Sequence, residues 1–318
     1  MSETLMIRVG ISACLAGHEV RWDGGHKRDA FLMETFGRYV EWVPVCPEFE
    51  MGLGAPRETL QLVRIAKQVR MVMPKTGVDY TDNMRAYAAG RVRELEKLDL
   101  CGYVLKKGSP SCGMERVKVF DAHRVPARTG RGLFAEVLME QLPNLPVEEE
   151  GRLADPHLRE NFIERVFAYA RLRALFASRW KLADLMAFHT AHKLLLMAHS
   201  PAAYQRLGRM VAGARALPRA ELRQRYESEF MGALRQMATT KRHLNVLQHV
   251  VGYFRKQLDD DSRRELHGLL EDYRAGIVPL TVPITLIRHY VRKFDVPYLR
   301  GQYYLDPHPK ELMLRNHV

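Results

Sequence analysis

The sequence predicts a two-part α/β protein: an N-terminal three-layer, Rossmann-like α/β domain and an all-α C-terminal domain. In the first 145 residues, short apolar runs alternate with segments of helical periodicity, which favours a mainly parallel sheet covered by helices. After that point the composition changes, because prolines and acidic residues interrupt the periodicity. Nearly every later segment then has the apolar spacing of a helix.

Three apolar runs are the predicted strands of the parallel sheet, at residues 7–13, 39–45 and 101–107. Each is bounded by small or turn-forming residues, which is typical of a buried strand that leaves a sheet through a tight turn. Two shorter runs, at 60–63 and 69–73, predict a hairpin.

Helices of the first domain are predicted at 27–38, 81–98 and 133–141. The segment 81–98 has the clearest pattern, because its apolar residues recur at the spacing of one helix face. These residues are Met84, Tyr87, Ala88, Val92, Leu95 and Leu98.

The boundary between the domains is predicted at the proline-containing run 143–146 and the acidic run that follows it. We assign residues 1–145 to the α/β domain, 146–160 to a linker and 161–318 to a basic helical domain. Six helices are predicted in the helical part, at 160–176, 179–197, 202–212, 219–258, 262–274 and 283–294. The longest is expected to break near Thr239.

The composition is that of an ordinary soluble protein. Of the 318 residues, 47% are hydrophobic and 27% are charged. No run approaches the roughly 18 consecutive apolar residues of a membrane span, so we expect no contact with a membrane. The N-terminal stretch lacks the pattern of a secretory signal, and we expect a cytoplasmic protein. Four cysteines in a chain of this length do not form a disulfide scaffold.

Charge is unevenly distributed. Residues 1–150 carry equal numbers of basic and acidic residues, so the whole net charge of +12 lies in residues 151–318. A basic domain beside a neutral one favours an acidic partner, such as RNA or a nucleotide. The alternative is that the basic surface only aids solubility.

Three of the four cysteines, Cys14, Cys46 and Cys112, follow predicted strands in short turns. Side chains at the carboxyl ends of neighbouring parallel strands meet at one edge of the sheet. Thiolates there would bind a soft metal or an iron–sulfur cluster, and the absence of a CxxC pair argues against a zinc ribbon. The alternative is three buried structural thiols. Cys101 begins a strand, so we place it at the opposite end of the sheet.

Several motifs of residues 6–142 resemble the TudS-type thiouracil desulfidase family. They are Ser12-Ala13-Cys14-Leu15, Arg21-Trp22-Asp23-Gly24, Cys46-Pro47-Glu48, Pro56-Arg57 and Ser109-Pro110-Ser111-Cys112-Gly113. Trp22 stands where that family more often has tyrosine. The second half resembles the helical domain of YbgA-type proteins, through Phe188-His189, His192-Lys193, Met197-Ala198-His199-Ser200 and Asn245-Val246-Leu247-Gln248-His249.

The resemblance implies a 4Fe-4S cluster held by Cys14, Cys46 and Cys112, and non-redox removal of sulfur from a thiolated uracil with release of hydrosulfide. It also implies an essential acid and an essential serine, which map to Glu48 and Ser109. The substrate would be a thiouracil base, a thiouridine nucleotide or a thiolated tRNA, the last held by the basic C-terminal domain.

These residue types suit that reaction. A thiocarbonyl sulfur is soft and would bind an open iron, and Glu48 could then act as general base for water. Ser111, Lys107 and Arg21 are candidate substrate-binding residues, with Lys106 as a further cation for a phosphate. The alternatives are that Glu48 caps a helix or pairs with an arginine, that the serines only satisfy a proline turn, and that the cations form a solvated face.

In the helical domain, His189, His192 and Lys193 share one helix face. The HExxH pattern is absent, so interhelical hydrogen bonds or contact with a polar ligand are favoured over a metal. Basic segments that also contain aromatic residues, at 241–243, 288–293 and 300–304, suit phosphate neutralisation and base stacking.

Two other functions are compatible with the sequence. One is a non-enzymatic RNA-binding or redox-sensing protein with a structural cluster or metal, and the other is a cluster enzyme of a different type, such as a dehydratase. The sequence does not predict the oligomeric state.

Overall fold

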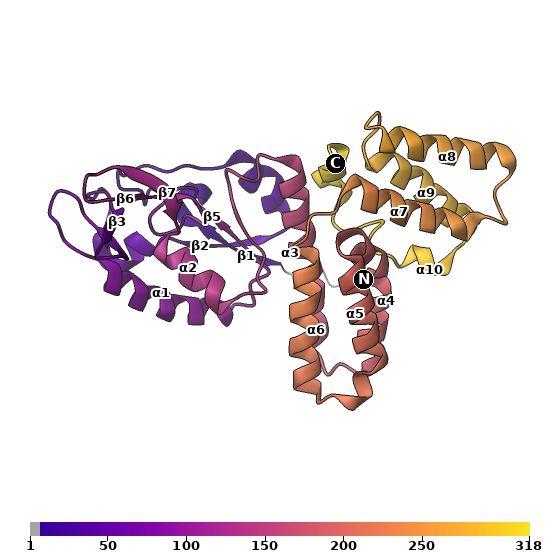
Figure 1. The fold of residues 1–318 in the computed structure, drawn as a ribbon, viewed down its shortest axis with the longest axis horizontal. Coiled ribbons are helices and arrows are strands. Elements are labelled where there is room, and N and C mark those ends of the chain that lie inside the picture. The colour runs from indigo at the N-terminus through magenta and orange to yellow at the C-terminus, as the bar shows by residue number, and fades with distance from the viewer. Residues whose placement is uncertain (1–6) are drawn as a thin grey trace. The chain divides into compact units, whose positions relative to one another are not determined.

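The structure is a computed structural model that describes residues 7–318 (Figure 1). The chain divides into two compact units, one up to Ala154 and one from Asp155 to Val318. The expectation about a secretory signal rests in part on residues 1–6, which lie outside the described residues. In the described part, no helix combines the length and the apolar character that crossing a membrane requires.

A four-stranded parallel sheet forms the centre of the N-terminal unit, in the order β2-β1-β5-β8. Its strands are β1 (Arg8–Ser12), β2 (Glu41–Val45), β5 (Gly102–Leu105) and β8 (Val147–Glu149). Ile11 of β1 pairs with Pro44 on one side and with Val104 on the other, so β1 is central. The apolar runs predicted the three longer strands because both faces of β1 and β5 are buried. The predicted α/β class with a parallel sheet is confirmed.

A second four-stranded sheet has the order β4-β3-β6-β7. It consists of β3 (Gln61–Ile65), β4 (Gln68–Val72), β6 (Val117–Phe120) and β7 (Pro126–Gly130). The predicted hairpin is confirmed, since β3 and β4 pair antiparallel. The strands β6 and β7 were not predicted: β7 is largely exposed and has no alternating apolar pattern, and β6 does alternate but is only four residues long.

The helices α1 (Thr81–Glu96) and α2 (Leu133–Gln141) pack against each other. The predicted apolar face of α1 is buried, through Met84, Ala88, Val92 and Leu95. The helix predicted at 27–38 is confirmed only in part, because helical turns begin at Ala30 and are not regular α-helix. That segment forms a π-helical turn (Phe31–Thr35) and a 3-10 turn (Phe36–Arg38), and Asp29 accepts a hydrogen bond from the Leu32 amide at 2.9 Å, which starts the helical turns late.

The segment assigned to a linker, 146–160, contains ordered elements. Residues Val147–Glu149 form β8 and pair with β5, and α3 (Pro156–Ala177) begins at Pro156. Asp155 caps this helix by accepting a hydrogen bond from the Leu158 amide at 3.0 Å. The chain therefore passes from the sheet to the first helix of the C-terminal unit within a few residues.

The C-terminal unit is helical, as predicted. After α3 come α4 (Leu182–His199), α5 (Pro201–Ala212), α6 (Arg219–Leu234), α7 (Thr240–Val251), α8 (Asp260–Arg274), α9 (Thr281–Lys293) and the short α10 (Pro297–Arg300). The expected break near Thr239 is confirmed, because Thr239 caps α7 by accepting a hydrogen bond from the Arg242 amide at 3.3 Å.

A buried charge network ties the last segment of this unit to α3. The guanidinium of Arg315 donates to Glu160 at 2.9 Å and to Glu164 at 3.0 Å, and Glu164 also pairs with His199. Burial alone would raise the pKa of Glu164, but the charges of His199 and Arg315 lower it to about 2. The carboxylate stays ionised in the core because it has these partners.

Candidate active site

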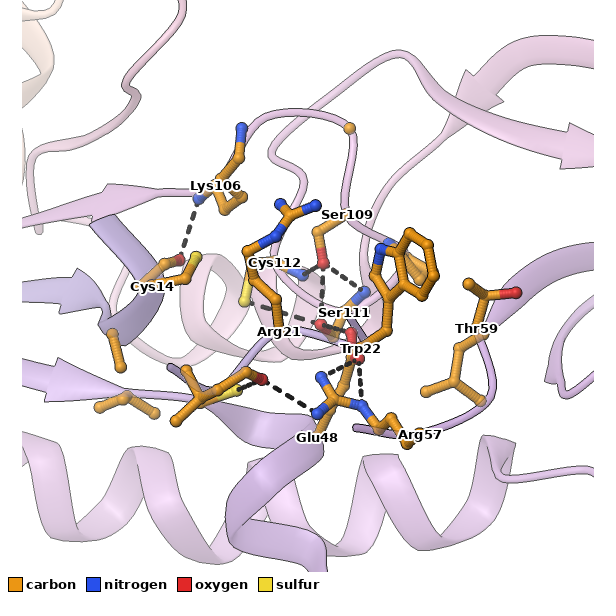
Figure 2. Close-up of a pocket in the computed structure, with 18 of the residues that line it drawn as sticks. Cys14, Arg21, Trp22, Glu48, Arg57, Thr59, Lys106, Ser109, Ser111 and Cys112 are labelled. Carbon is orange, nitrogen blue, oxygen red and sulfur yellow. Dashed lines mark hydrogen bonds and ion pairs between the residues drawn. The ribbon is translucent and has the colours of Figure 1, made fainter. Parts of the chain in front are cut away.

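The carboxyl ends of β1, β2 and β5 meet at one edge of the parallel sheet. Cys14 lies in a 3-10 turn directly after β1, Cys46 directly follows β2, and Cys112 lies in the loop after β5. All three thiols line one cavity of about 240 Å³ (Figure 2). Cys101 precedes β5 and lies at the other end of the sheet.

The loop 108–113 is held in place by α2. The Leu133 amide donates to the Pro110 carbonyl at 3.1 Å and the Phe134 amide donates to the Ser111 carbonyl at 3.0 Å. These bonds satisfy amides of the first helical turn, which have no partner within the helix. Gly132 permits the close approach, since a Cβ there would lie 2.4 Å from the Ser111 carbonyl oxygen.

Burial disfavours the thiolate form of all three cysteines, and the nearby cations Lys106, Arg21 and Arg57 offset this only in part. Burial raises the pKa of Cys14 to about 11 and also raises the pKa values of Cys46 and Cys112. A negative charge on Cys46 adds to the rise in pKa at both Cys14 and Cys112. Bound iron would offset both effects by stabilising the thiolates.

Three thiols line the cavity, and thiolates are the usual ligands of iron–sulfur clusters. Within residues 7–318, no three His, Cys, Asp or Glu side chains are close enough to hold one metal ion. Three thiols spread around one cavity suit a cluster that has several irons, each bound by one thiolate. Cys14, Cys46 and Cys112 are therefore the residues that could hold such a group.

Glu48 lies in this cavity and is held from both sides (Figure 2). Its Oε2 accepts hydrogen bonds from Arg57 Nε at 3.1 Å and Nη2 at 2.6 Å, and its Oε1 accepts one from Ser111 Oγ at 2.6 Å. Pairing with an arginine was one alternative from the sequence, and the structure shows it. The pairing does not remove the carboxylate from the cavity.

Arg57 also fixes two loops. Its Nη1 donates to the carbonyl of Val20 at 2.9 Å and to that of Gly54 at 2.6 Å, and its side chain is only 5% exposed. One guanidinium thus joins the loop after β1, the loop after β2 and the Glu48 carboxylate.

Ser109 and Ser111 extend the hydrogen bonding of Glu48. The two hydroxyl oxygens lie 2.9 Å apart. Because Ser111 gives its single proton to Glu48, Ser109 donates to Ser111. Ser109 Oγ also accepts from the Cys112 amide at 3.1 Å. The result is a chain from Ser109 through Ser111 to Glu48, along which a proton can move. Ser111, not Ser109, contacts the carboxylate.

The predicted basic residues all line the cavity, with different partners. Arg21 pairs with Asp23 at 3.2 Å, and Lys106 pairs with Glu150. The Lys107 ammonium has no ion pair in the described part of the chain, so it is available to a ligand. Trp22 also lines the cavity and is 48% exposed.

Sequence reasoning missed the role of Glu50. Its Oε1 accepts from the Cys46 amide at 3.0 Å, while its Oε2 accepts from Arg91 Nε of α1 at 2.9 Å. Glu50 therefore anchors the Cys46 turn to α1. No signal in the sequence links residues so far apart.

Comparison with known proteins matches each unit to a different family. Residues 9–150 match the family described as 2-thiouracil desulfurase, and residues 193–309 match a family described as protein of unknown function, DUF1722. Both resemblances noted in the sequence are thereby confirmed.

Individual relatives each match less than half of this chain. The uncharacterized protein YbgA of Escherichia coli strain K12 is 33% identical over 153 residues, which cover 48% of this chain and 90% of YbgA. The uncharacterized protein YbbK of Bacillus subtilis strain 168 is 25% identical over 137 residues, which cover 41% of this chain and 88% of YbbK. A solved structure of the 4Fe-4S-dependent thiouracil desulfidase TudS is 25% identical, with a TM-score of 0.38, and the match covers 46% of this chain and 93% of that chain.

Proposed function

Because the chain belongs to the family of YbgA and its N-terminal half matches the 2-thiouracil desulfurase family, we propose that it removes sulfur from a thiolated uracil compound. In this reaction water replaces the sulfur of a C=S group, which gives a C=O group and hydrosulfide without electron transfer. The cofactor is a 4Fe-4S cluster held by Cys14, Cys46 and Cys112.

The observation that carries the proposal is the position of Glu48, held by Arg57 and Ser111 inside the cavity that the three thiols line. When bound, a cluster with one iron free of protein ligands supplies a Lewis acid for the soft thiocarbonyl sulfur. Glu48 takes a proton from the attacking water. Arg57 orients the carboxylate through two hydrogen bonds, and Ser111 and Ser109 extend the hydrogen-bonded chain through which the proton can leave.

Residues at the rim of the cavity bind the rest of the substrate. The exposed indole of Trp22 offers a flat surface on which a uracil ring can stack. Lys107 supplies a positive charge for a phosphate if the substrate is a nucleotide, and Arg21 also lines the cavity.

The first experiment is anaerobic purification of the full chain with iron and sulfide analysis, followed by sulfide release from 2- and 4-thiouracil and their nucleotides. We expect about four irons and four sulfides per chain. Glu48→Gln should keep the cluster and slow sulfide release by about 100-fold, the usual contribution of a general base. The matched control is Glu41→Gln, which changes an exposed carboxylate at the start of β2. It should alter neither the iron content nor the rate of sulfide release.

Two outcomes would contradict the proposal. Full activity of Glu48→Gln would remove Glu48 from the reaction. A cluster-loaded protein that releases no sulfide from any thiolated uracil would favour a structural or redox-sensing cluster.

The second part of the proposal is that the C-terminal half binds the nucleic acid when the substrate is a thiolated tRNA. Its support is the charge distribution, because residues 151–318 carry the whole net charge of +12. With thiolated tRNA as substrate, kcat/KM should fall steeply as salt rises, while kcat/KM for free thiouracil should stay nearly constant. Equal salt dependence for both substrates would argue against a nucleic acid partner.

A further inference from the structure

A second cavity, of about 580 Å³, lies within the C-terminal unit between α4 and α5, and we refer to it as the α4–α5 pocket. The two helices pack against each other (Figure 1). One wall is a single face of α4, since its residues follow the helical spacing i, i+3, i+4 and i+7. These residues are Met186, His189, Thr190 and Lys193. The other wall comes from α5, through Tyr204, Gln205, Gly208, Arg209, Val211 and Ala212.

His189 has an unused hydrogen-bonding atom at this pocket. Its Nδ1 lies 3.1 Å from the Tyr226 hydroxyl, but its Nε2 is buried and has no partner among the described residues. The residue is only 3% exposed. Leaving a buried polar atom unpaired is costly, so an unpaired nitrogen that lines a cavity indicates a ligand atom as its partner.

Gly208 keeps the space in front of that nitrogen open. A Cβ at this position would lie 4.0 Å from His189 Nε2, so a longer side chain would enter the space that a ligand needs. Glycine within a helix costs about 1 kcal/mol relative to alanine. Its presence in the middle of α5 is consistent with a requirement for that space.

The pocket is positively charged. Lys193 and Arg209 line it from opposite helices, and neither side chain has an ion pair or hydrogen bond within residues 7–318. No Asp or Glu is among the lining residues. Burial and the charge of Lys193 lower the pKa of His189 to about 4, so the imidazole is neutral at pH 7 and can donate a hydrogen bond. Two free cations and a neutral donor suit a dianion.

We propose that the α4–α5 pocket binds a phosphate monoester about the size of a mononucleotide. The dianionic phosphate lies between Lys193 and Arg209 and accepts a hydrogen bond from His189 Nε2. The organic part of the ligand packs against the apolar side of the pocket, formed by Met186 and Val211. A volume of about 580 Å³ is within the range of sites that enclose small ligands. This site is separate from the thiol-lined cavity and does not rest on the proposed desulfidation.

The test is calorimetric titration of the full chain with uridine 5′-monophosphate, inorganic phosphate, uridine and the dinucleoside phosphate UpU. Uridine 5′-monophosphate should bind best, because it alone has both a dianionic phosphate and an organic part. Uridine and UpU should each bind at least about tenfold more weakly, since the first lacks the phosphate and the second has only a monoanionic diester. Inorganic phosphate should also bind more weakly, because it lacks the organic part.

Variants separate this pocket from the thiol-lined cavity, which could also hold a nucleotide. Gly208→Leu should fold at least as well as the natural chain, because leucine is a better helix former, and should block the pocket. Lys193→Met and Arg209→Met should each weaken binding by at least about tenfold. Lys256→Met removes an exposed charge outside the pocket and outside the basic segments named above, and is the matched control.

His189 gives a further comparison. His189→Gln keeps a polar group at this position and should bind better than His189→Phe, which keeps only the ring. Unchanged affinity in Gly208→Leu, or equal weakening by Lys193→Met and Lys256→Met, would overturn the proposal. So would the absence of heat from uridine 5′-monophosphate at millimolar concentration.

Discussion

Arg57 is the residue on which the geometry of the thiol-lined cavity depends most. Its guanidinium binds Glu48 with two nitrogens, and its third nitrogen binds two carbonyls from different loops. Both side chains of the Glu48–Arg57 pair are largely buried. Removing one partner of a buried pair leaves an uncompensated charge, which is more harmful than removing both.

We therefore expect Arg57→Met to lower the free energy of unfolding of the N-terminal unit by about 3 kcal/mol. Combining it with Glu48→Gln should recover part of that loss, because the unpaired carboxylate is then gone. Urea denaturation of the two single variants and the double variant measures this coupling. Strictly additive losses would show that the pair does not act as a unit.

At the scale of residues, the sequence predicted that Cys14, Cys46 and Cys112 lie together because each follows a predicted strand, whereas Glu48 was identified through the family resemblance. The order of Ser109 and Ser111 in the hydrogen-bonded chain could not be predicted, since it depends on how one loop turns above α2. The roles of Arg57 and Glu50 were also beyond prediction. Each joins segments that only the tertiary fold brings together.

At the scale of elements, the spacing of apolar residues predicted helices well where the helix has one buried face. It predicted α2 with its observed bounds and α1 nearly so. It failed for β8, whose acidic sequence is typical of a loop. Glu149 is buried there because it accepts from the Met114 amide at 2.7 Å, and Glu148 because it accepts from Arg152 Nε at 2.6 Å. These distant partners outweigh the local preference.

The contact between α2 and the loop 108–113 can be tested with a single methyl group. Gly132→Ala places a Cβ about 2.4 Å from the Ser111 carbonyl oxygen, so the loop must move. We expect a loss of about 2 kcal/mol in stability, together with reduced sulfide release. Gly232→Ala is the matched control, because a Cβ in that part of α6 meets nothing within 4 Å and should stabilise slightly. Thermal unfolding of both variants is the measurement. A lower melting temperature in Gly132→Ala alone indicates a steric conflict, and a lower melting temperature in both indicates a general effect of alanine.

At the scale of the whole molecule, the sequence located the transition from α/β to helical structure through composition, and it located the excess charge. It could not show how the second unit uses its histidines. Several are buried and neutral: burial lowers the pKa of His243 to about 3 and the pKa values of His189 and His308 to about 4.

The low pKa values of these histidines predict that the C-terminal unit becomes less stable in acid. Between pH 6.5 and pH 4 the unfolded chain binds protons that the folded chain excludes, so stability falls as pH falls. Between pH 7 and pH 5, each of these histidines should lower the free energy of unfolding by about 2 kcal/mol. His199 acts in the opposite direction, since Glu164 raises its pKa. Its effect is smaller than the sum of the three histidines whose pKa values are lowered.

Unfolding in urea at pH 7 and pH 5, followed by far-ultraviolet circular dichroism, measures this dependence. His243→Phe should reduce the difference between the two pH values, because phenylalanine cannot take up a proton. A difference that is the same in this variant would mean that His243 is protonated equally in the folded and unfolded chain. The groups that act on His243 are Arg315, His199, Glu164 and His157.

The bonds from Arg315 to α3 have a consequence for synthesis on the ribosome. Glu160 and Glu164 precede Arg315 by 155 and 151 residues, so α3 is made long before the guanidinium that neutralises its carboxylates. The N-terminal unit contains all four strands of its parallel sheet and can fold while translation continues. The C-terminal unit cannot complete its folding until its last segment has been synthesised. During that interval the nascent helices expose apolar surface, and this half of the chain is where we expect a need for chaperones.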